Sequence, residues 1–350
     1  MRRSLLIQRC LIVALGILSI GAGWFLHDIP LSYAKKATSS VPVTNTPVSA
    51  VSKPISSRLS TPTTAATTQG PAYHGDAITQ STFYQLTSGL RPGRGTPIPS
   101  ASSVQELPVV DVSFYNWRGE LLSGWLALQT PQAPVIILSH GTPGNRVGML
   151  SRAAFLYKHG YNVLLFDFQS YGKSQGTIST LGMVESEDIL SAISYIHGLP
   201  EMVYSKVGVL GLSMGATAAV LAAARSKDID ALVAESCPVD ATLVTSDVPN
   251  EASREADKEL VEQVYGVDIT KARPIDAVSK LSGRTAIFLI NGDKDDTTPL
   301  SGMQSLYQAA GQPKQEWVAP GAAHAQSFDV DTAAYIANVD AFFDTYLMDG

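Results

Sequence analysis

The chain has 350 residues, of which 45% are hydrophobic and 16% are charged, and its formal net charge at pH 7 is -6. This composition is typical of a globular protein, and the lack of a basic excess argues against a nucleic-acid partner. The two cysteines, Cys10 and Cys237, are too few for a disulfide framework or for a zinc site built from cysteine.

The first 34 residues have the pattern of an export signal. Three arginines precede an uncharged apolar run over residues 10–26, and polar residues follow it. Arginine is costly to move across a bilayer, so the basic end is expected to stay in the cytoplasm. Small residues around Ser32 suit signal peptidase, yet the run is also nearly long enough to remain as an anchor. The sequence therefore predicts a signal peptide or N-terminal membrane anchor over 1–34 and an exported protein, in the cell envelope or outside the cell.

Residues 35–75 have a different composition from the rest of the chain. Ser, Thr, Pro, Ala and Val dominate, and no acidic residue lies between Asp28 and Asp76. Such a segment has neither the bulk nor the periodicity to form a core, so we expect a disordered tether. A lead-in segment, residues 76–108, then connects the tether to a folded domain over 109–350.

Strand and helix patterns alternate in the folded domain. Two segments, 109–116 and 121–128, flank a glycine-containing connection and predict an antiparallel hairpin. Continuous apolar runs predict further buried strands at 134–141, 161–176 with its polar loop, 206–213, 228–236 and 284–292. Helical patterns lie at 147–158, 184–199, 214–225 and 332–347. The order predicts an α/β fold, with a mostly parallel sheet covered by helices on both faces.

Polar residues follow several of the predicted strands. In an open parallel sheet the carboxyl ends of the strands lie along one edge, where functional groups collect. The residues at this edge are Ser139, His140, Gly141, Asp167, Ser213, Glu235, Ser236, Cys237, Asp293, Asp295, Asp296 and His324. We therefore expect a serine, several carboxylates and two histidines to meet there.

Ser213 lies in the pattern G-x-S-x-G, between Gly211 and Gly215, with a predicted strand before it and a helix after it. A sharp strand-to-helix turn crowds the positions two residues either side of the serine, which favours glycine there. The free N–H groups at the start of the helix favour negative charge. The pattern predicts a nucleophilic serine.

His324 is the candidate base for Ser213. A serine hydroxyl is a poor nucleophile until a base accepts its proton. His324 follows the last strand in a loop rich in glycine and alanine, which can fold over the edge of the sheet. His159 and His197 end predicted helices, where a surface histidine is common.

Three carboxylates, Asp293, Asp295 and Asp296, follow the strand at 284–292 and could orient this base. An aspartate-rich loop can also bind a cation, but no second ligand cluster or EF-hand pattern accompanies this one. The string G-K-S at 172–174 is similar to a phosphate-binding loop. Asp167 stands where that loop requires glycine, and its charge would repel phosphate, so nucleotide binding is set aside.

Five segments carry a resemblance to a known superfamily: LSHGTPGNR, DFQSYGKSQG, GLSMG, GDKDDTTP and PGAAH. From about residue 109 to the C-terminus the chain resembles an α/β hydrolase of the bacterial serine-hydrolase or esterase type. The order of Ser213, an aspartate and His324 is the order of that superfamily. The resemblance implies an α/β-hydrolase fold with a short cap insertion at about 238–282.

The resemblance also implies roles for individual residues. In relatives the catalytic acid stands three residues after a glycine, which puts it on Asp295, with Asp296 as the alternative. The backbone N–H groups of Met214 and Thr142 would form the oxyanion hole. His140 would then be structural, beneath the turn that carries Thr142.

The sequence predicts a serine hydrolase that cleaves a carboxylic ester through an acyl-enzyme, with Ser213, Asp295 and His324 as its triad. We expect a small-molecule acyl substrate, no cofactor, no metal and no nucleic acid, with membrane tethering through the N-terminal segment as an option. A peptidase, amidase or thioesterase with the same triad is an alternative. A non-catalytic binding module on a hydrolase scaffold is the alternative of another class.

Overall fold

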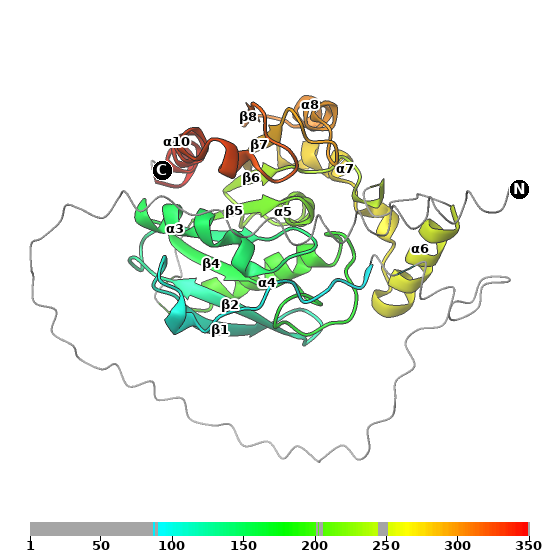
Figure 1. The fold of residues 1–350 in the computed structure, drawn as a ribbon, viewed down its shortest axis with the longest axis horizontal. Coiled ribbons are helices and arrows are strands. Elements are labelled where there is room, and N and C mark those ends of the chain that lie inside the picture. The colour runs from blue at the N-terminus through cyan, green and yellow to red at the C-terminus, as the bar shows by residue number, and fades with distance from the viewer. Residues whose placement is uncertain (1–86, 88–89, 201, 203–205, 244–250, 349–350) are drawn as a thin grey trace, which may run out of the picture. The chain divides into compact units, whose positions relative to one another are not determined.

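The computed structural model describes residues 87, 90–200, 202, 206–243 and 251–348 (Figure 1). The predicted signal or anchor at 1–34 and the predicted tether at 35–75 lie outside these residues. Within the described part of the chain, no helix combines the length and apolar character needed to cross a membrane. All described residues belong to one compact unit, Thr67–Gly350.

Eight strands of the described chain form one sheet in the order β1-β2-β4-β3-β5-β6-β7-β8. Their bounds are β1 Val110–Tyr115, β2 Leu121–Ala127, β3 Val135–Ser139, β4 Asn162–Phe166, β5 Val207–Leu212, β6 Ala231–Glu235, β7 Ala286–Gly292 and β8 Lys314–Ala319. β1 and β2 form the predicted antiparallel hairpin, β2 also pairs antiparallel with β4, and the remaining pairs are parallel. The structure confirms the predicted fold class.

The edge strand β8 has no counterpart among the strands predicted from apolar runs. Of its six residues only Ala319 is buried, because β8 lies at the end of the sheet beside β7 alone. A half-exposed strand carries no continuous apolar run, so its sequence gives a weak signal.

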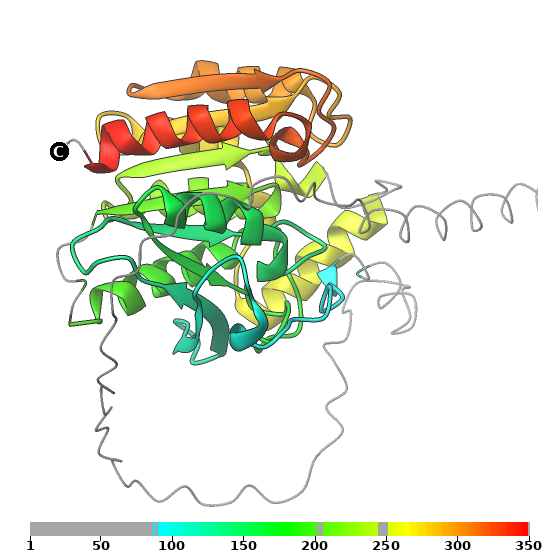
Figure 2. The same cartoon turned by 60° about the vertical axis from the view of Figure 1, so that its left-hand side comes forward.

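Two hydrophobic layers, one on each face of the sheet, hold the helices other than α6. The helices are α3 Leu150–Lys158, α4 Glu185–His197, α5 Met214–Ala223, α6 Glu251–Tyr265, α7 Pro274–Ala277, α8 Leu300–Ala309, α9 Ser327–Val330 and α10 Thr332–Phe343. α3 and α10 share one layer with Ile136, and α4, α5 and α8 share the other with Ile137. Successive side chains of a strand point to opposite faces, which explains why these neighbours belong to different layers. In Figure 2 the red helix α10 runs across the near face of the sheet.

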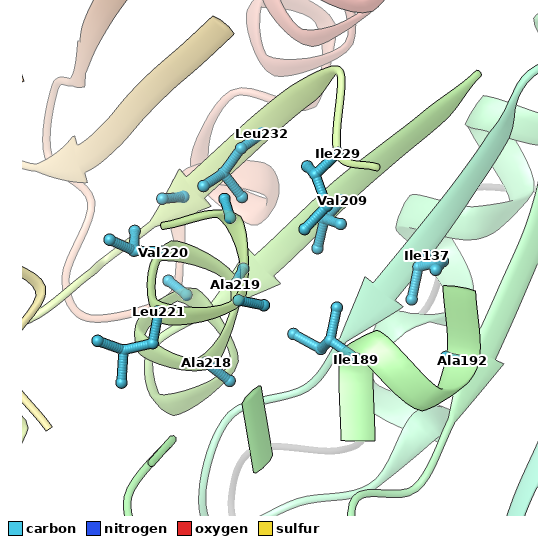
Figure 3. Packing of buried hydrophobic residues seen from close by; sticks show 14 of the residues in the cluster. Ile137, Ile189, Ala192, Val209, Ala218, Ala219, Val220, Leu221, Ile229 and Leu232 are labelled. Atoms are coloured by element: carbon cyan, nitrogen blue, oxygen red, sulfur yellow. The ribbon is translucent and has the colours of Figure 1, made fainter. Parts of the chain in front are cut away.

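Helix α5 packs closely on the centre of the sheet. All ten of its residues are buried, and most are small. Figure 3 shows Val209 of β5 and Leu232 of β6 beside the alanines of α5. Small side chains let the helix approach the strands, so that Ser213, between β5 and α5, is held between two tightly packed elements.

Helix α6, within the predicted cap insertion, buries one face against the loop that follows β4. Ala256 and Leu260, four residues apart on one face of the helix, are fully buried and share a cluster with Ile178. Val264, four residues further on, is only partly buried, while Tyr265 is almost fully buried. The hydroxyl of Tyr265 donates a hydrogen bond to the carbonyl of Ile178 at 3.1 Å, which draws this side of the helix inward.

Candidate active site

The turn between β5 and α5 has the sharp geometry that the glycines predict. Ser213 has φ 54° and ψ -116°, a conformation that is disfavoured for residues other than glycine. A Cβ on Gly215 would lie 2.2 Å from the carbonyl oxygen of Ser139, and one on Gly211 would lie 2.5 Å from the carbonyl oxygen of Gly215. No larger side chain fits at either position without moving the backbone.

Ser213, His324 and Asp295 form one chain of hydrogen bonds. Nε2 of His324 lies 2.9 Å from Oγ of Ser213, and Nδ1 lies 2.9 Å from Oδ2 of Asp295. The Asp295 side chain is fully buried, whereas that of His324 is 24% exposed. Asp296, the alternative acid, is exposed. This geometry allows His324 to accept the serine proton while Asp295 orients the imidazole.

The loop after β7 stabilises the charged form of Asp295. The backbone N–H groups of Thr297 and Thr298 donate to Oδ1 at 3.0 and 2.7 Å, and the Thr298 hydroxyl donates to Oδ2 at 2.8 Å. Burial alone would raise the pKa of Asp295, but the hydrogen bonds from His324 and Thr298 outweigh it and hold the pKa below the ordinary value. Thr298 was not among the residues predicted from the sequence; an aspartate commonly accepts the backbone N–H two residues on, as Asp295 does from Thr297, and that local pattern points to this loop.

The turn after β3 lies directly against the nucleophile. A Cβ on Gly141 would lie 3.2 Å from Cβ of Ser213. Thr142 follows it, and its hydroxyl accepts a hydrogen bond from Tyr171 at 3.0 Å. Met214 begins α5, so its N–H belongs to the first turn of the helix, where N–H groups have no partner within the helix. Of the two predicted oxyanion donors, Met214 directly follows Ser213, and Thr142 follows the glycine that lies against it.

His140 is buried beneath this turn. Nε2 lies 3.2 Å from the backbone N–H of Phe168 and accepts its hydrogen, and Nδ1 lies 2.8 Å from the carbonyl oxygen of Gly141. Burial lowers the pKa of His140, which favours the neutral ring with its proton on Nδ1. A neutral, fully bonded imidazole supports the turn and leaves His324 as the histidine at the serine.

Asp167, one of the residues predicted at the edge of the sheet, binds Arg146, which follows the turn after β3. Its Oδ1 accepts the backbone N–H of Arg146 at 2.9 Å, and its Oδ2 accepts the guanidinium at 2.9 Å. Oδ2 also accepts the backbone N–H of Lys173 at 2.8 Å, so the G-K-S string is bound to a carboxylate. Asp167 and Arg146 are both fully buried.

A cavity of about 150 Å³ opens at the nucleophile. Its lining consists of His140, Gly141, Thr142, Pro143, Gly144, Asn145, Gly148, Met149, Leu212, Ser213, His324 and Ala325. A second cavity of about 270 Å³ lies beside the Asp295 loop, where Cys237, Val239 and Pro299 form part of its wall. Within the described residues, no group of three or more histidine, cysteine, aspartate or glutamate side chains could hold a metal ion.

A buried cluster behind the site, Arg152, Glu235 and Tyr335, was not found from the sequence. Arg152 donates to both oxygens of Glu235 at 2.9 and 3.0 Å, and the hydroxyl of Tyr335 donates to Glu235 at 2.9 Å. Burial opposes the Arg152 cation, but Glu235 and Tyr335 outweigh it, so the pKa of Arg152 rises. The three residues are far apart in the chain, and only Glu235 was among the residues predicted at the edge of the sheet.

Comparisons with known proteins agree with this architecture. A family model described as X-Pro dipeptidyl-peptidase (S15 family) matches residues 96–264. The Mycobacterium tuberculosis protein Rv2307c is 27% identical over 231 residues, which cover 65% of this chain and 76% of that protein. The Aspergillus aculeatus thiohydrolase aneE is 29% identical over 150 residues, covering 42% of this chain and 47% of that protein.

Solved structures share the fold. The Pyrococcus furiosus esterase Pf2001 superimposes with a TM-score of 0.60 at 24% identity, over 73% of this chain and 99% of that one. Dienelactone hydrolase from Anabaena variabilis gives a TM-score of 0.52 at 18% identity, over 68% of this chain and 98% of that one. At identities this low, the structural likeness establishes the arrangement of strands and helices alone.

Proposed function

We propose that the chain is a serine hydrolase of the α/β-hydrolase superfamily that cleaves a carboxylic ester through an acyl-enzyme; the match to the S15 family model and the fold shared with an esterase support this assignment. The observation that carries the proposal is the chain of hydrogen bonds from Ser213 through His324 to Asp295, with 2.9 Å at both links. Ser213 and His324 line a cavity, and Ser213 directly precedes the first residue of α5.

The proposed reaction begins when Oγ of Ser213 attacks the ester carbonyl carbon and its proton passes to Nε2 of His324. Asp295 stays ionised, keeps a proton on Nδ1 and stabilises the imidazolium that forms. The carbonyl oxygen becomes an oxyanion, which the N–H groups of Met214 and Thr142 stabilise.

The tetrahedral intermediate then loses the alcohol, whose oxygen takes the proton from His324. A water molecule enters, gives a proton to His324 and attacks the acyl carbon. The bond between the acyl group and Ser213 breaks, the carboxylic acid leaves, and Oγ recovers its proton from His324. No group from outside the chain is needed besides the ester and water.

The cavity at Ser213 supports a small, uncharged substrate group. At about 150 Å³ it is the size of a cavity that holds one benzene molecule. Its lining residues, among those the structure describes, include neither aspartate nor glutamate and neither lysine nor arginine. Burying an unpaired charge against such a wall would be costly, which favours a neutral ester group here.

The match to the S15 family model supports a second candidate, cleavage of a peptide bond by the same triad. An exopeptidase that acts from the N-terminus needs a negative charge for the free ammonium group of its substrate. Two aspartates line the second cavity: Asp240 is paired with Arg273, and Asp296 directly follows Asp295. The cavity at Ser213 itself has no carboxylate in its lining, so the ester is the better supported substrate there, and a thioester, which the name of the relative aneE raises, would use the same steps.

An activity panel separates these candidates. The purified protein is given p-nitrophenyl acetate, an acetyl thioester and an X-Pro p-nitroanilide, with Ser213→Ala as the matched control. We expect the highest kcat/KM on the ester and no turnover by Ser213→Ala. Faster turnover of the anilide would favour the peptidase, and no turnover of any substrate would favour a binding module.

We also propose, from the sequence of residues 1–34, that the protein is exported and that this segment is a signal peptide or a membrane anchor. The mass of the mature protein, measured after cell fractionation, tests this. Loss of about the first 34 residues would identify a signal peptide, and a full-length protein in the membrane fraction would identify an anchor. A full-length protein in the cytosol would contradict both.

A further inference from the structure

Glu235, the last residue of β6, and Ser236, which follows it, form hydrogen bonds to Ser213 and to the residue after His324. The carbonyl oxygen of Glu235 accepts the backbone N–H of Ser213 at 2.9 Å. The side-chain oxygen of Ser236 accepts the backbone N–H of Ala325 at 3.1 Å, and Ala325 directly follows His324. Two successive residues are therefore bonded to the nucleophile itself and to the residue that follows the base.

Ser236 adopts a backbone conformation that favours glycine. Its φ is 51°, in the left-handed region, and its N–H donates to the carbonyl of Ile290 at 2.8 Å. Ala325, at the other end of the bond, has φ 63°. Glycine at position 236 would adopt this conformation with less strain, but it would lack the oxygen that accepts the Ala325 N–H. The hydroxyl is the feature that distinguishes serine from glycine at this position.

The next peptide unit, between Ala325 and Gln326, is held through its carbonyl group. Arg152, fixed by its paired hydrogen bonds to Glu235, donates from Nη2 to the carbonyl oxygen of Ala325 at 3.5 Å. Ala325 is thus bonded at its N–H by Ser236 and at its C=O by the partner of Glu235. Ser236 makes the first of these bonds, and Glu235 fixes the arginine that makes the second. The carbonyl of Glu235 also accepts the backbone N–H of Ser213.

We infer that Ser236 is a positioning residue for His324: its hydroxyl holds the Ala325 peptide so that Nε2 stays within hydrogen-bond distance of Ser213. This inference rests on the proposed function, because it assigns a role in the same proton transfer. Ser236 is fully buried and cannot touch a substrate in the cavity. Its loss therefore affects the chemical step and leaves substrate binding nearly unchanged.

Two substitutions separate positioning from ordinary stabilisation. Ser236→Ala keeps the Cβ and the backbone strain and removes only the acceptor, whereas Ser236→Gly also relieves the strain. Thr285→Ala is the matched control, because it removes a buried hydroxyl that donates to the carbonyl of Ile229 at 2.8 Å, at the start of β7 and away from the site. For each variant we would measure kcat and KM on p-nitrophenyl acetate, the melting temperature and the rate at which a phosphonate probe labels Ser213.

We expect both Ser236 variants to lower kcat roughly tenfold, the effect of one lost hydrogen bond, with KM changed by less than about twofold. The labelling rate should fall by a similar factor. Ser236→Gly should melt at the same temperature as Ser236→Ala or higher and still be impaired, while Thr285→Ala should lose stability and keep its kcat.

Three outcomes would overturn the inference. The first is a kcat for Ser236→Ala within twofold of wild type, while the probe still labels Ser213 in wild type. In that case the proposed function would hold and the role of Ser236 would be wrong. The second is a fall in kcat that is proportional to the fall in melting temperature in all three variants, because lost stability would then explain the lost activity. Failure of the probe to label wild-type Ser213 would overturn the proposed function, and this inference with it.

Discussion

Ser213 and His324 lie 2.9 Å apart, yet the molecule holds them in two different ways. Ser213 sits in the middle of the sheet, on a turn whose shape depends on backbone atoms and on the absence of side chains at Gly211 and Gly215. His324 lies on a partly exposed loop after β8, and side-chain atoms of Asp295 and Ser236 hold it and the peptide that follows. The nucleophile should therefore be sensitive to added volume, and the base to lost polar atoms.

The largest expected effect comes from adding volume beside the nucleophile. In Gly215→Ala the new Cβ would lie 2.2 Å from the carbonyl oxygen of Ser139 and 2.7 Å from that of His140, neither of which can move alone. We expect a loss of more than about 3 kcal/mol in the free energy of unfolding and no measurable ester hydrolysis. Gly93→Ala, where a Cβ meets nothing within 4 Å, is the control and should match wild type. Urea unfolding and an ester assay on both variants make the test, and a fully active Gly215→Ala would contradict the steric account of the turn.

Removing one polar contact from the base region should have a large effect on activity and a smaller one on folding. In Asp295→Asn the amide cannot stabilise an imidazolium and can present its NH₂ group to Nδ1, which reverses the required tautomer. We expect kcat to fall by about 10⁴, as in other serine triads. The matched variant Asp296→Asn changes an exposed carboxylate and should stay within about twofold of wild type. Equal losses in both variants would show that the acid had been assigned wrongly.

The pH dependence of stability gives the smallest expected effect. Because the pKa of Asp295 is lowered from its ordinary value of 3.8, the ionised carboxylate stabilises the folded protein above pH 3.8. That contribution disappears as the pH falls through the lower, folded-state pKa. The difference in free energy of unfolding between wild type and Asp295→Asn should therefore stay constant from pH 6 to about pH 4 and shrink as the pH falls further. Urea unfolding across this range measures it, with Thr285→Ala as a control whose difference from wild type stays constant, and a difference for Asp295→Asn that grows on acidification would contradict the assignment.

The same contrast explains what could be predicted from the sequence. The turn at Ser213 is a local feature: five consecutive residues carry the glycines and the serine, and the flanking strand and helix are recognisable by their own patterns. The buried strands were predicted for the same reason, since both their faces are covered and their apolar runs are continuous. β8 lacked this signal because it lies at the edge.

The contacts that position His324 join residues far apart in the sequence, so no local sequence pattern predicts them. Ser236 and Ala325 are 89 residues apart, and Arg152 and Glu235 are 83 residues apart. Arg152 lies in a helix, where an arginine is usually exposed, and its burial follows only from the way α3 packs on the sheet. The choice of Asp295 among three neighbouring carboxylates came from the spacing in a resembling superfamily, and the structure adds its hydrogen bonds to His324.

Covalent labelling of Ser213 tests the proposed chemistry most directly. The intact protein is treated with an active-site phosphonate probe, digested, and the modified residue is located by mass spectrometry, with His324→Ala treated in parallel. We predict one adduct, on Ser213, that forms in wild type and is lost or greatly slowed in His324→Ala. A folded wild-type protein that forms no adduct at Ser213, or one labelled equally fast without His324, would contradict a serine hydrolase that works through these two residues.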